Sequence, residues 1–441
     1  MSEALFSCIL VGVHLDNSRE AGTAAAAERF ERSMRELAAL AEAAGMRVLG
    51  SFGQHVREIS AATYIGSGKA EEIRNYLKMM ETEDPVDAVL VNDTISPAQL
   101  ENLSDLLELP ILDRTGLILR IFADRARTRE ARLQVESAQL QYMLPRLQGM
   151  HRELGRQGGG SGPISNKGAG ETKIELDRRH IEQRMARLRK ELEAVARERE
   201  TQRSRRLDSG IPRVSLVGYT NAGKSTIMNA VLNLCGAGDE RRVLEKDMLF
   251  ATLDTTVRRI EPGGRNRPFL LSDTVGFVSN LPTTLVRAFR STLEEACHAD
   301  LMLIVTDLSD PDYAAQAAVT QQTLREIGAG AVPRIFVFNK ADAAGIRTAP
   351  HLDGIEPEDG LVTISARNPE DVRRLVDLIV TRLEEGREEC ELCIPYADGA
   401  LLAQLRKETA FTVLGYEAEG TRVLARLGQQ ERRKYLPYMV E

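Results

Sequence analysis

VSLVGYTNAGKS, residues 214–225, joins a short apolar run to the pattern GxxxxGK(S/T) with no position missing. This pattern places a glycine-rich loop between a buried strand and a helix, so that consecutive backbone N–H groups point at bound phosphates. Lys224 is predicted to bring positive charge to the β- and γ-phosphates, and the Ser225 hydroxyl to ligate Mg²⁺. The predicted phosphate-binding residues are Gly218, Tyr219, Thr220, Asn221, Ala222, Gly223, Lys224, Ser225 and Thr226.

A second motif follows the apolar run at residues 269–272 and reads Asp273, Thr274, Val275, Gly276. A carboxylate at a strand end can reach Mg²⁺ through water, and the Gly276 amide can meet a γ-phosphate. The segment is therefore predicted to sense whether that phosphate is present.

Two later motifs predict a guanine pocket. Residues 339–342 read Asn339, Lys340, Ala341, Asp342, and residues 365–367 read Ser365, Ala366, Arg367; each follows an apolar run. Asp342 can accept two hydrogen bonds, from the guanine N1–H and the exocyclic amine, and adenine has no such pair of donors. Four ordered motifs at the strand ends of a doubly wound pattern predict a GTPase domain over residues 211–384.

GTPases of this kind also carry a threonine that contacts Mg²⁺ from the switch, the segment whose conformation depends on the γ-phosphate. Thr252, Thr255 and Thr256 all lie between the P-loop helix and the DTVG segment, as such a threonine must. The motifs alone leave these three candidates open.

Phe277 follows Gly276 directly, at a position where many GTPases carry a glutamine that orients the attacking water. A phenyl ring neither donates nor accepts a hydrogen bond of that kind. We therefore expect slow intrinsic hydrolysis that awaits a partner or a residue from elsewhere. A simple core role for Phe277 leads to the same expectation.

The rest of the chain predicts three further parts. Residues 1–116 alternate short apolar runs with helical stretches, which predicts a small α/β domain with a parallel sheet. Residues 385–441 predict a small α+β domain. The fold class is therefore α/β: a doubly wound P-loop GTPase domain, preceded by a small α/β domain and a helical hairpin arm, with a small α+β C-terminal domain.

The arm is predicted over residues 117–207. Seven-residue apolar stripes, such as Leu133–Leu140–Leu147 and Ile174–Ile181–Leu188, predict two long helices in an antiparallel hairpin around a glycine-rich loop at 155–170. The arm is also rich in arginine. A solvated face of Glu–Arg pairs is one interpretation, and a surface that reaches toward an anionic partner is the other.

Composition bounds the class of protein. The 441 residues are 43% hydrophobic and 28% charged, with a net charge of -7 and five cysteines. These values predict a globular cytoplasmic protein without a membrane span or disulfides, in which nucleic-acid contact needs a local basic patch. We expect the unbound protein to be monomeric, and peripheral association with a membrane is left open.

Gly66-Ser67-Gly68-Lys69 resembles a second P-loop but fails the pattern, because Thr63 stands at the first glycine position and Ala70 after the lysine. A second, ATP-binding site here, and with it an ATP-dependent RNA remodeller, remains the alternative from another functional class.

The motifs together resemble the HflX family, ribosome-associated GTPases of the Obg–HflX group. The segments that carry the resemblance are GYTNAGKST (218–226), LFATLD (249–254), DTVGFVSNLP (273–282), NKAD and SAR, with DRT (113–115) and GAGETKIE (168–175) outside the GTPase domain. Ala169 and Lys173 depart from the family's usual proline and glutamine.

This resemblance implies several expectations. Thr252 becomes the switch threonine and a second Mg²⁺ ligand beside Ser225, with Lys224, Thr252 and Gly276 as the catalytic group. The nucleotide-binding set is extended by Phe250, Ala251, Thr252, Leu253 and Asp254. The expected partners are GTP or GDP, the large ribosomal subunit and its rRNA, and the expected function is dissociation of ribosomes under stress. A GTPase that acts in assembly of the large subunit is the alternative.

Overall fold

The structure is a computed structural model of the whole chain. It describes residues 6–15, 24–82, 84–157, 167–207, 210–236, 249–250, 253, 255–263, 266–279, 295–346, 348–352, 354–356, 359–409 and 411–440. The chain divides into two compact units. Unit 1 comprises 1–195, 248–253 and 279–289, and unit 2 comprises 196–247, 254–278 and 290–441.

Unit 1 contains a four-stranded sheet in the order β2-β1-β3-β4, and every pair of neighbours is parallel. The predicted parallel sheet is confirmed. Its elements are β1 (Phe6–Leu15), α1 (Ala24–Ala43), β2 (Met46–Val56), α2 (Ser67–Met80), β3 (Ala88–Val91), α3 (Pro97–Leu107), β4 (Ile111–Asp113) and α4 (Arg114–Arg125).

The helix α4 runs across the expected boundary between residues 116 and 117. Its apolar face packs into the α/β domain, where Leu117, Ile118 and Phe122 are buried. Asp113 begins the helix, because its side chain accepts a hydrogen bond from the Gly116 amide at 2.8 Å. The same carboxylate binds the Tyr142 hydroxyl at 2.6 Å and Arg146 at 2.7 Å, so it also holds the next helix.

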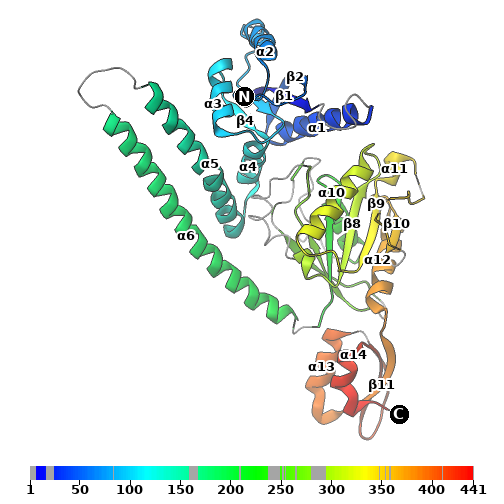
Figure 1. Cartoon of the computed structure of the whole chain (residues 1–441). Coiled ribbons are helices and arrows are strands. Elements are labelled where there is room, and N and C mark those ends of the chain that lie inside the picture. The colour runs from blue at the N-terminus through cyan, green and yellow to red at the C-terminus, as the bar shows by residue number, and fades with distance from the viewer. Residues whose placement is uncertain are drawn as a thin grey trace. The chain divides into compact units, whose positions relative to one another are not determined.

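The arm consists of α5 (Arg129–Gln157) and α6 (Lys167–Leu207), which run side by side (Figure 1). Arg184 of α6 binds both carboxylate oxygens of Glu136 of α5, at 2.6 and 2.7 Å. Seven residues further along α6, Glu191 pairs with Arg129, which lies seven residues earlier in α5. This register is that of antiparallel helices, and the helical hairpin is confirmed.

Unit 2 contains a six-stranded sheet in the order β10-β9-β8-β5-β7-β6, parallel except for β6. Helices α7 and α12 share one apolar core with it, which includes Val231 and Leu375. The doubly wound pattern is confirmed. Its elements are β5 (Arg213–Gly218), α7 (Lys224–Leu234), β6 (Thr256–Ile260), β7 (Phe269–Asp273), β8 (Leu301–Asp307), α10 (Tyr313–Glu326), β9 (Arg334–Asn339), α11 (Ala341–Ala344), β10 (Gly360–Thr363) and α12 (Pro369–Glu384).

The C-terminal part of unit 2 is an antiparallel sheet in the order β11-β13-β12, with a separate small core that includes Leu392 and Leu405. The predicted α+β domain is confirmed. Its elements are β11 (Glu388–Pro395), α13 (Gly399–Glu408), β12 (Phe411–Tyr416), β13 (Gly420–Leu427) and α14 (Gln429–Tyr435).

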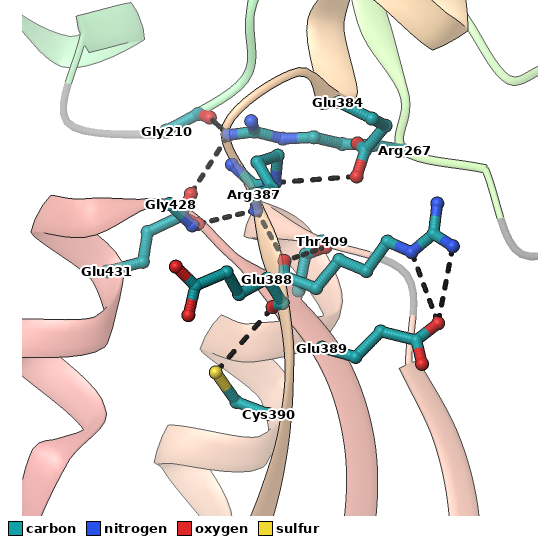
Figure 2. Close-up of polar contacts among 11 residues, drawn as sticks. Gly210, Arg267, Glu384, Arg387, Glu388, Glu389, Cys390, Thr409, Gly428 and Glu431 are labelled. Carbon is teal, nitrogen blue, oxygen red and sulfur yellow. Dashed lines mark hydrogen bonds and ion pairs between the residues drawn. The ribbon is translucent and has the colours of Figure 1, made fainter.

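Glu431 of α14 binds two arginines near the start of β11 (Figure 2). One carboxylate oxygen accepts from Arg267 at 3.1 Å, and the other accepts from Arg387. Arg267 also donates to the carbonyl of Gly210. Burial, and then the charge of Arg387, lower the pKa of Arg267. Glu431 therefore compensates the positive charge of two guanidinium groups that are largely removed from water.

In the described part of the chain, none of the helices combines the length and the apolar character that a bilayer crossing requires.

Candidate guanine-nucleotide site

The P-loop lies between β5 and α7, as the sequence predicts. Gly223 ends the loop at φ +92°, and a Cβ there would lie 2.2 Å from Nδ2 of Asn339. Glycine is therefore required by both backbone conformation and space. The Lys224 ammonium is buried and donates to the carbonyls of Gly218 and Tyr219 at 3.1 and 2.7 Å. Burial lowers the pKa of Lys224 to about 8, and the charge of Asp273 opposes this shift.

Ser225 and Asp273 form the pair of oxygen donors expected near Mg²⁺. The Ser225 hydroxyl donates to Oδ2 of Asp273 at 2.6 Å, and Asp273 is fully buried at the end of β7. A hydroxyl and a carboxylate are hard oxygen ligands, which Mg²⁺ prefers together with substrate phosphates and water. Across the described residues, no cluster of three or more His, Cys, Asp or Glu residues could hold a metal independently of a nucleotide. The residues present thus fit a cation that binds with a nucleotide.

The DTVG segment lies directly against the P-loop. A Cβ added to Gly276 would lie 2.7 Å from Cα of Thr220 and 2.9 Å from Nζ of Lys224. Only glycine allows the backbone to come this close to the lysine. The Thr274 hydroxyl donates to the Leu216 carbonyl at 2.7 Å and ties the segment to β5.

Phe277 continues this pairing through its backbone. Its amide donates to the Gly218 carbonyl at 3.1 Å, and its carbonyl accepts from the Thr220 amide at 2.8 Å. The side chain is 3% exposed. Phe277 is therefore a core residue, and its ring carries no group that could orient a water.

The predicted guanine motifs meet at one cavity of about 310 Å³. Asn339 holds its two sides together: its Nδ2 donates to the Ala222 carbonyl at 2.9 Å, and its Oδ1 accepts from the Ala366 amide at 3.1 Å. The cavity is lined by Asn221, Gly223, Thr226, Asn339, Lys340, Asp342, Ala343, Ser365, Ala366 and Arg367. Ala343 was not among the predicted residues, although its place one residue after the motif on α11 could have suggested it.

One carboxylate, Asp342, lines this cavity, and a second, Asp307, holds the lining residue Lys340. The Ser365 hydroxyl binds Asp342 and, as the largest cause, holds the pKa of Asp342 below its ordinary value. Asp307, at the end of β8, accepts from the Lys340 ammonium at 2.8 Å and from the Ser309 hydroxyl at 2.6 Å. Asp307 was not among the predicted residues, because its strand carries no nucleotide motif.

The switch residues are only partly described. Ala251, Thr252 and Asp254 lie outside the described residues, so the choice of Thr252 stays a prediction. Within unit 1, Phe250 packs edge-on against Phe122 with ring centroids 4.6 Å apart. Thr256 begins β6 opposite Asp273, and Thr255 precedes that strand.

The sequence around Lys69 lacks the context of a P-loop. The preceding strand β2 ends at Val56, ten residues before Gly66, so no strand runs directly into the turn. The Lys69 ammonium pairs with Glu72 of its own helix at 2.7 Å.

Comparison with known proteins covers most of the chain. Family models described as "GTP-binding GTPase N-terminal", "GTP-binding GTPase Middle Region" and "50S ribosome-binding GTPase" match residues 31–123, 125–206 and 213–340. GTPase HflX of Alkalihalophilus pseudofirmus is 39% identical over 416 residues, which is 91% of this chain and 93% of that protein. GTPase HflX of Caldanaerobacter subterraneus subsp. tengcongensis is 44% identical over 367 residues, 83% of this chain and 80% of that protein.

Among solved structures, a GTP-binding protein from Sulfolobus solfataricus in complex with GDP is 23% identical, with a TM-score of 0.43. The match covers 86% of this chain and 99% of that one.

Proposed function

Since this chain belongs to the HflX family of GTPases, we propose that it hydrolyses GTP with Mg²⁺ in the cytoplasm, binds the large ribosomal subunit, and dissociates ribosomes while loaded with GTP. The observation that carries the nucleotide part is the single cavity lined by Asn339, Asp342 and Ser365 next to the P-loop. The ribosomal part is supported by the family and by the charge of the arm.

In this proposal each motif has a separate task. Asp342 selects guanine, the P-loop amides and Lys224 hold the phosphates, and the Gly276 amide responds to the γ-phosphate. Ser225 and Thr252 would hold Mg²⁺ directly and Asp273 would hold it through water; the bound ion would neutralise charge on the phosphate oxygens. Lys224 lies in a buried site, where a positive charge stabilises developing negative charge more strongly than in water.

The arm supplies the proposed contact with rRNA. Arg178 and Arg184 of α6 are engaged by Glu182 and Glu136, so part of the arginine-rich face does consist of Glu–Arg pairs. Arg187 and Arg189 are exposed, and within the described part of α5 and α6 no carboxylate forms an ion pair with either. Exposed arginines of this kind suit contact with phosphates by shape and charge and not by base sequence.

The first test measures dissociation and turnover together. We expect the GTP-loaded protein to convert intact ribosomes into subunits on sucrose gradients, and the GDP-loaded protein to leave them intact. Purified large subunits should raise the GTP turnover rate, because Phe277 supplies no group that orients water. Equal activity with either nucleotide, or a flat rate on adding subunits, would contradict the proposal. Preferential sedimentation with precursor particles would favour the assembly GTPase instead.

The second test concerns the arm. The double variant Arg187→Glu/Arg189→Glu is expected to bind large subunits more weakly and to lower the slope of log K against log salt by about one to two, the value for one or two lost phosphate contacts. Arg373→Glu, an exposed arginine on α12, is the matched control and should keep both affinity and slope. An unchanged slope in the double variant would exclude the arm as the phosphate contact.

A further inference from the structure

Three backbone amides in and just before the loop at residues 365–367 donate hydrogen bonds to three different residues outside that loop. The amide of Ile364, just before it, donates to the Phe338 carbonyl of β9 at 2.8 Å. The Ala366 amide donates to Asn339 at 3.1 Å. Between these two, the Ser365 amide donates to Oδ2 of Asp371 at 2.8 Å. Of these three acceptors, Asp371 alone belongs neither to a strand nor to a guanine motif.

Asp371 lies in the first turn of α12, where carboxylates often serve as caps of their own helix. Here that role belongs to Asn368, whose side chain accepts from the Glu370 amide at 3.0 Å. One oxygen of Asp371 points instead at the Ser365 amide, and the other accepts from Arg374 at 2.6 Å. The Asp371 carboxylate therefore holds the loop that precedes α12 and does not cap the helix.

The connection from Asp371 to the base runs through Ser365. The Ser365 oxygen accepts from the Arg367 amide at 3.3 Å. Ser365 and Asp342 line the same cavity, and hydrogen bonding from Ser365 is the largest cause that lowers the pKa of Asp342. Ser365 is 5% exposed, so it has little room to choose another partner. The direction in which Asp342 presents its two oxygens thus depends on where the Ser365 backbone is held.

The position of Asp371 is itself fixed, because the helix α12 that carries it is packed into the core. Val372, Leu375 and Ile379 are buried in the core of the six-stranded sheet. Asp371 itself does not line the 310 Å³ cavity, whereas Asp342, Ser365 and Arg367 do.

We propose that Asp371 is a positioning residue for guanine recognition: it holds the Ser365 amide so that the Ser365 hydroxyl orients Asp342 toward the base. This inference rests on the guanine-nucleotide site proposed above and extends it to a residue that does not touch the nucleotide. Guanine offers two donors, N1–H and the exocyclic amine, and so needs both oxygens of Asp342 correctly directed, whereas a base without the amine needs only one.

The experiment compares GDP with inosine diphosphate, whose base lacks the exocyclic amine, by titration calorimetry on the full chain. Asp371→Ala is expected to weaken GDP binding about tenfold, and inosine diphosphate binding much less, so that the preference for GDP falls. Asp371→Asn keeps an oxygen for the Ser365 amide and should retain most of the preference. Asp377→Ala, an exposed position on the same helix, is the matched control and should behave as the unmodified protein.

A double-mutant cycle then separates positioning from general damage. In a chain that already carries Asp342→Ala, adding Asp371→Ala should change GDP affinity by less than about twofold, because the group being positioned is gone. Additive effects, equal losses for both nucleotides, or an Asp371→Asn variant as poor as Asp371→Ala would overturn the proposal. If Asp342→Ala alone left the preference for GDP intact, the guanine site itself would be refuted and this inference with it.

Discussion

Lys224→Ala is expected to lower kcat/KM for GTP by about 100- to 1,000-fold, the usual loss when one preorganised electrostatic group is removed from a buried site. The reason lies in the position of the ammonium, which is buried against the P-loop carbonyls and 2.9 Å from the place of a Cβ on Gly276. No other described lysine lies in this position. Single-turnover hydrolysis followed by phosphate release measures the effect.

The fold of this variant should not suffer. Burial lowers the pKa of Lys224 to about 8, so without a nucleotide the charged form is disfavoured by the folded protein. A group of this kind opposes folding at pH values below about 8, where it is protonated in both states, and this opposition is lost as the pH rises from about 8 to its ordinary pKa of 10.5. We therefore expect the nucleotide-free variant to be at least as stable at pH 7 as the unmodified chain.

Lys69→Ala is the matched control, because Lys69 belongs to the incomplete P-loop pattern in unit 1. GTP turnover should remain unchanged in this variant. An ATPase activity that survived Lys224→Ala and disappeared with Lys69→Ala would contradict a single nucleotide site and support the ATP-dependent RNA remodeller.

Arg114→Met is expected to lower the free energy of unfolding by about 3–5 kcal/mol, the cost of breaking a buried ion pair by removing one partner. Arg114 is 1% exposed and binds Glu36 at 2.5 Å and Asn92 at 3.0 Å. It also donates to the Ser279 carbonyl, whose own amide donates to Glu36. Removing the guanidinium leaves these acceptors in a dry environment. Urea unfolding of the full chain, followed by circular dichroism, measures the loss.

The control for this prediction is an exposed pair. Arg426 binds Glu389 at 3.3 Å with both side chains 57% exposed, and Arg426→Met should cost less than about 1 kcal/mol. Adding Glu36→Gln to Arg114→Met should recover part of the loss, because the second change removes the uncompensated charge. A loss below about 1 kcal/mol for Arg114→Met would show that the pair contributes no more than a surface contact.

Most of the fold follows from periodicity in the sequence. Apolar runs between helical stretches correctly predict the parallel four-stranded sheet and the parallel strands of the six-stranded sheet, because buried parallel strands need continuous apolar residues and crossover helices. The limits of individual strands are harder to predict. Strand β2 continues to Val56 through polar Gln54 and His55, because its backbone pairing with β1 continues there.

The nucleotide site follows from its motifs for a similar reason. Strand ends of a doubly wound sheet meet at one edge, so ordered motifs at those ends must converge. Supporting residues carry no such signal. Asp371 reaches Ser365 from the first turn of α12, six residues further along, and Glu36 meets Arg114 and Ser279 across long stretches of sequence. Nothing in their spacing distinguishes these carboxylates from those on the surface.

Phe277 has a consequence for the timing of the reaction. Both of its main-chain groups are bonded to the P-loop and its ring is enclosed, so residue 277 forms part of the wall of the site. Grafting a glutamine at this position would place an amide in the core and would not supply a catalyst. Under the proposed function, the chain alone holds GTP and a group supplied by the partner completes its cleavage. We therefore expect the lifetime of the GTP-loaded state to be set by the time that the protein takes to meet its partner, since hydrolysis begins only after that contact.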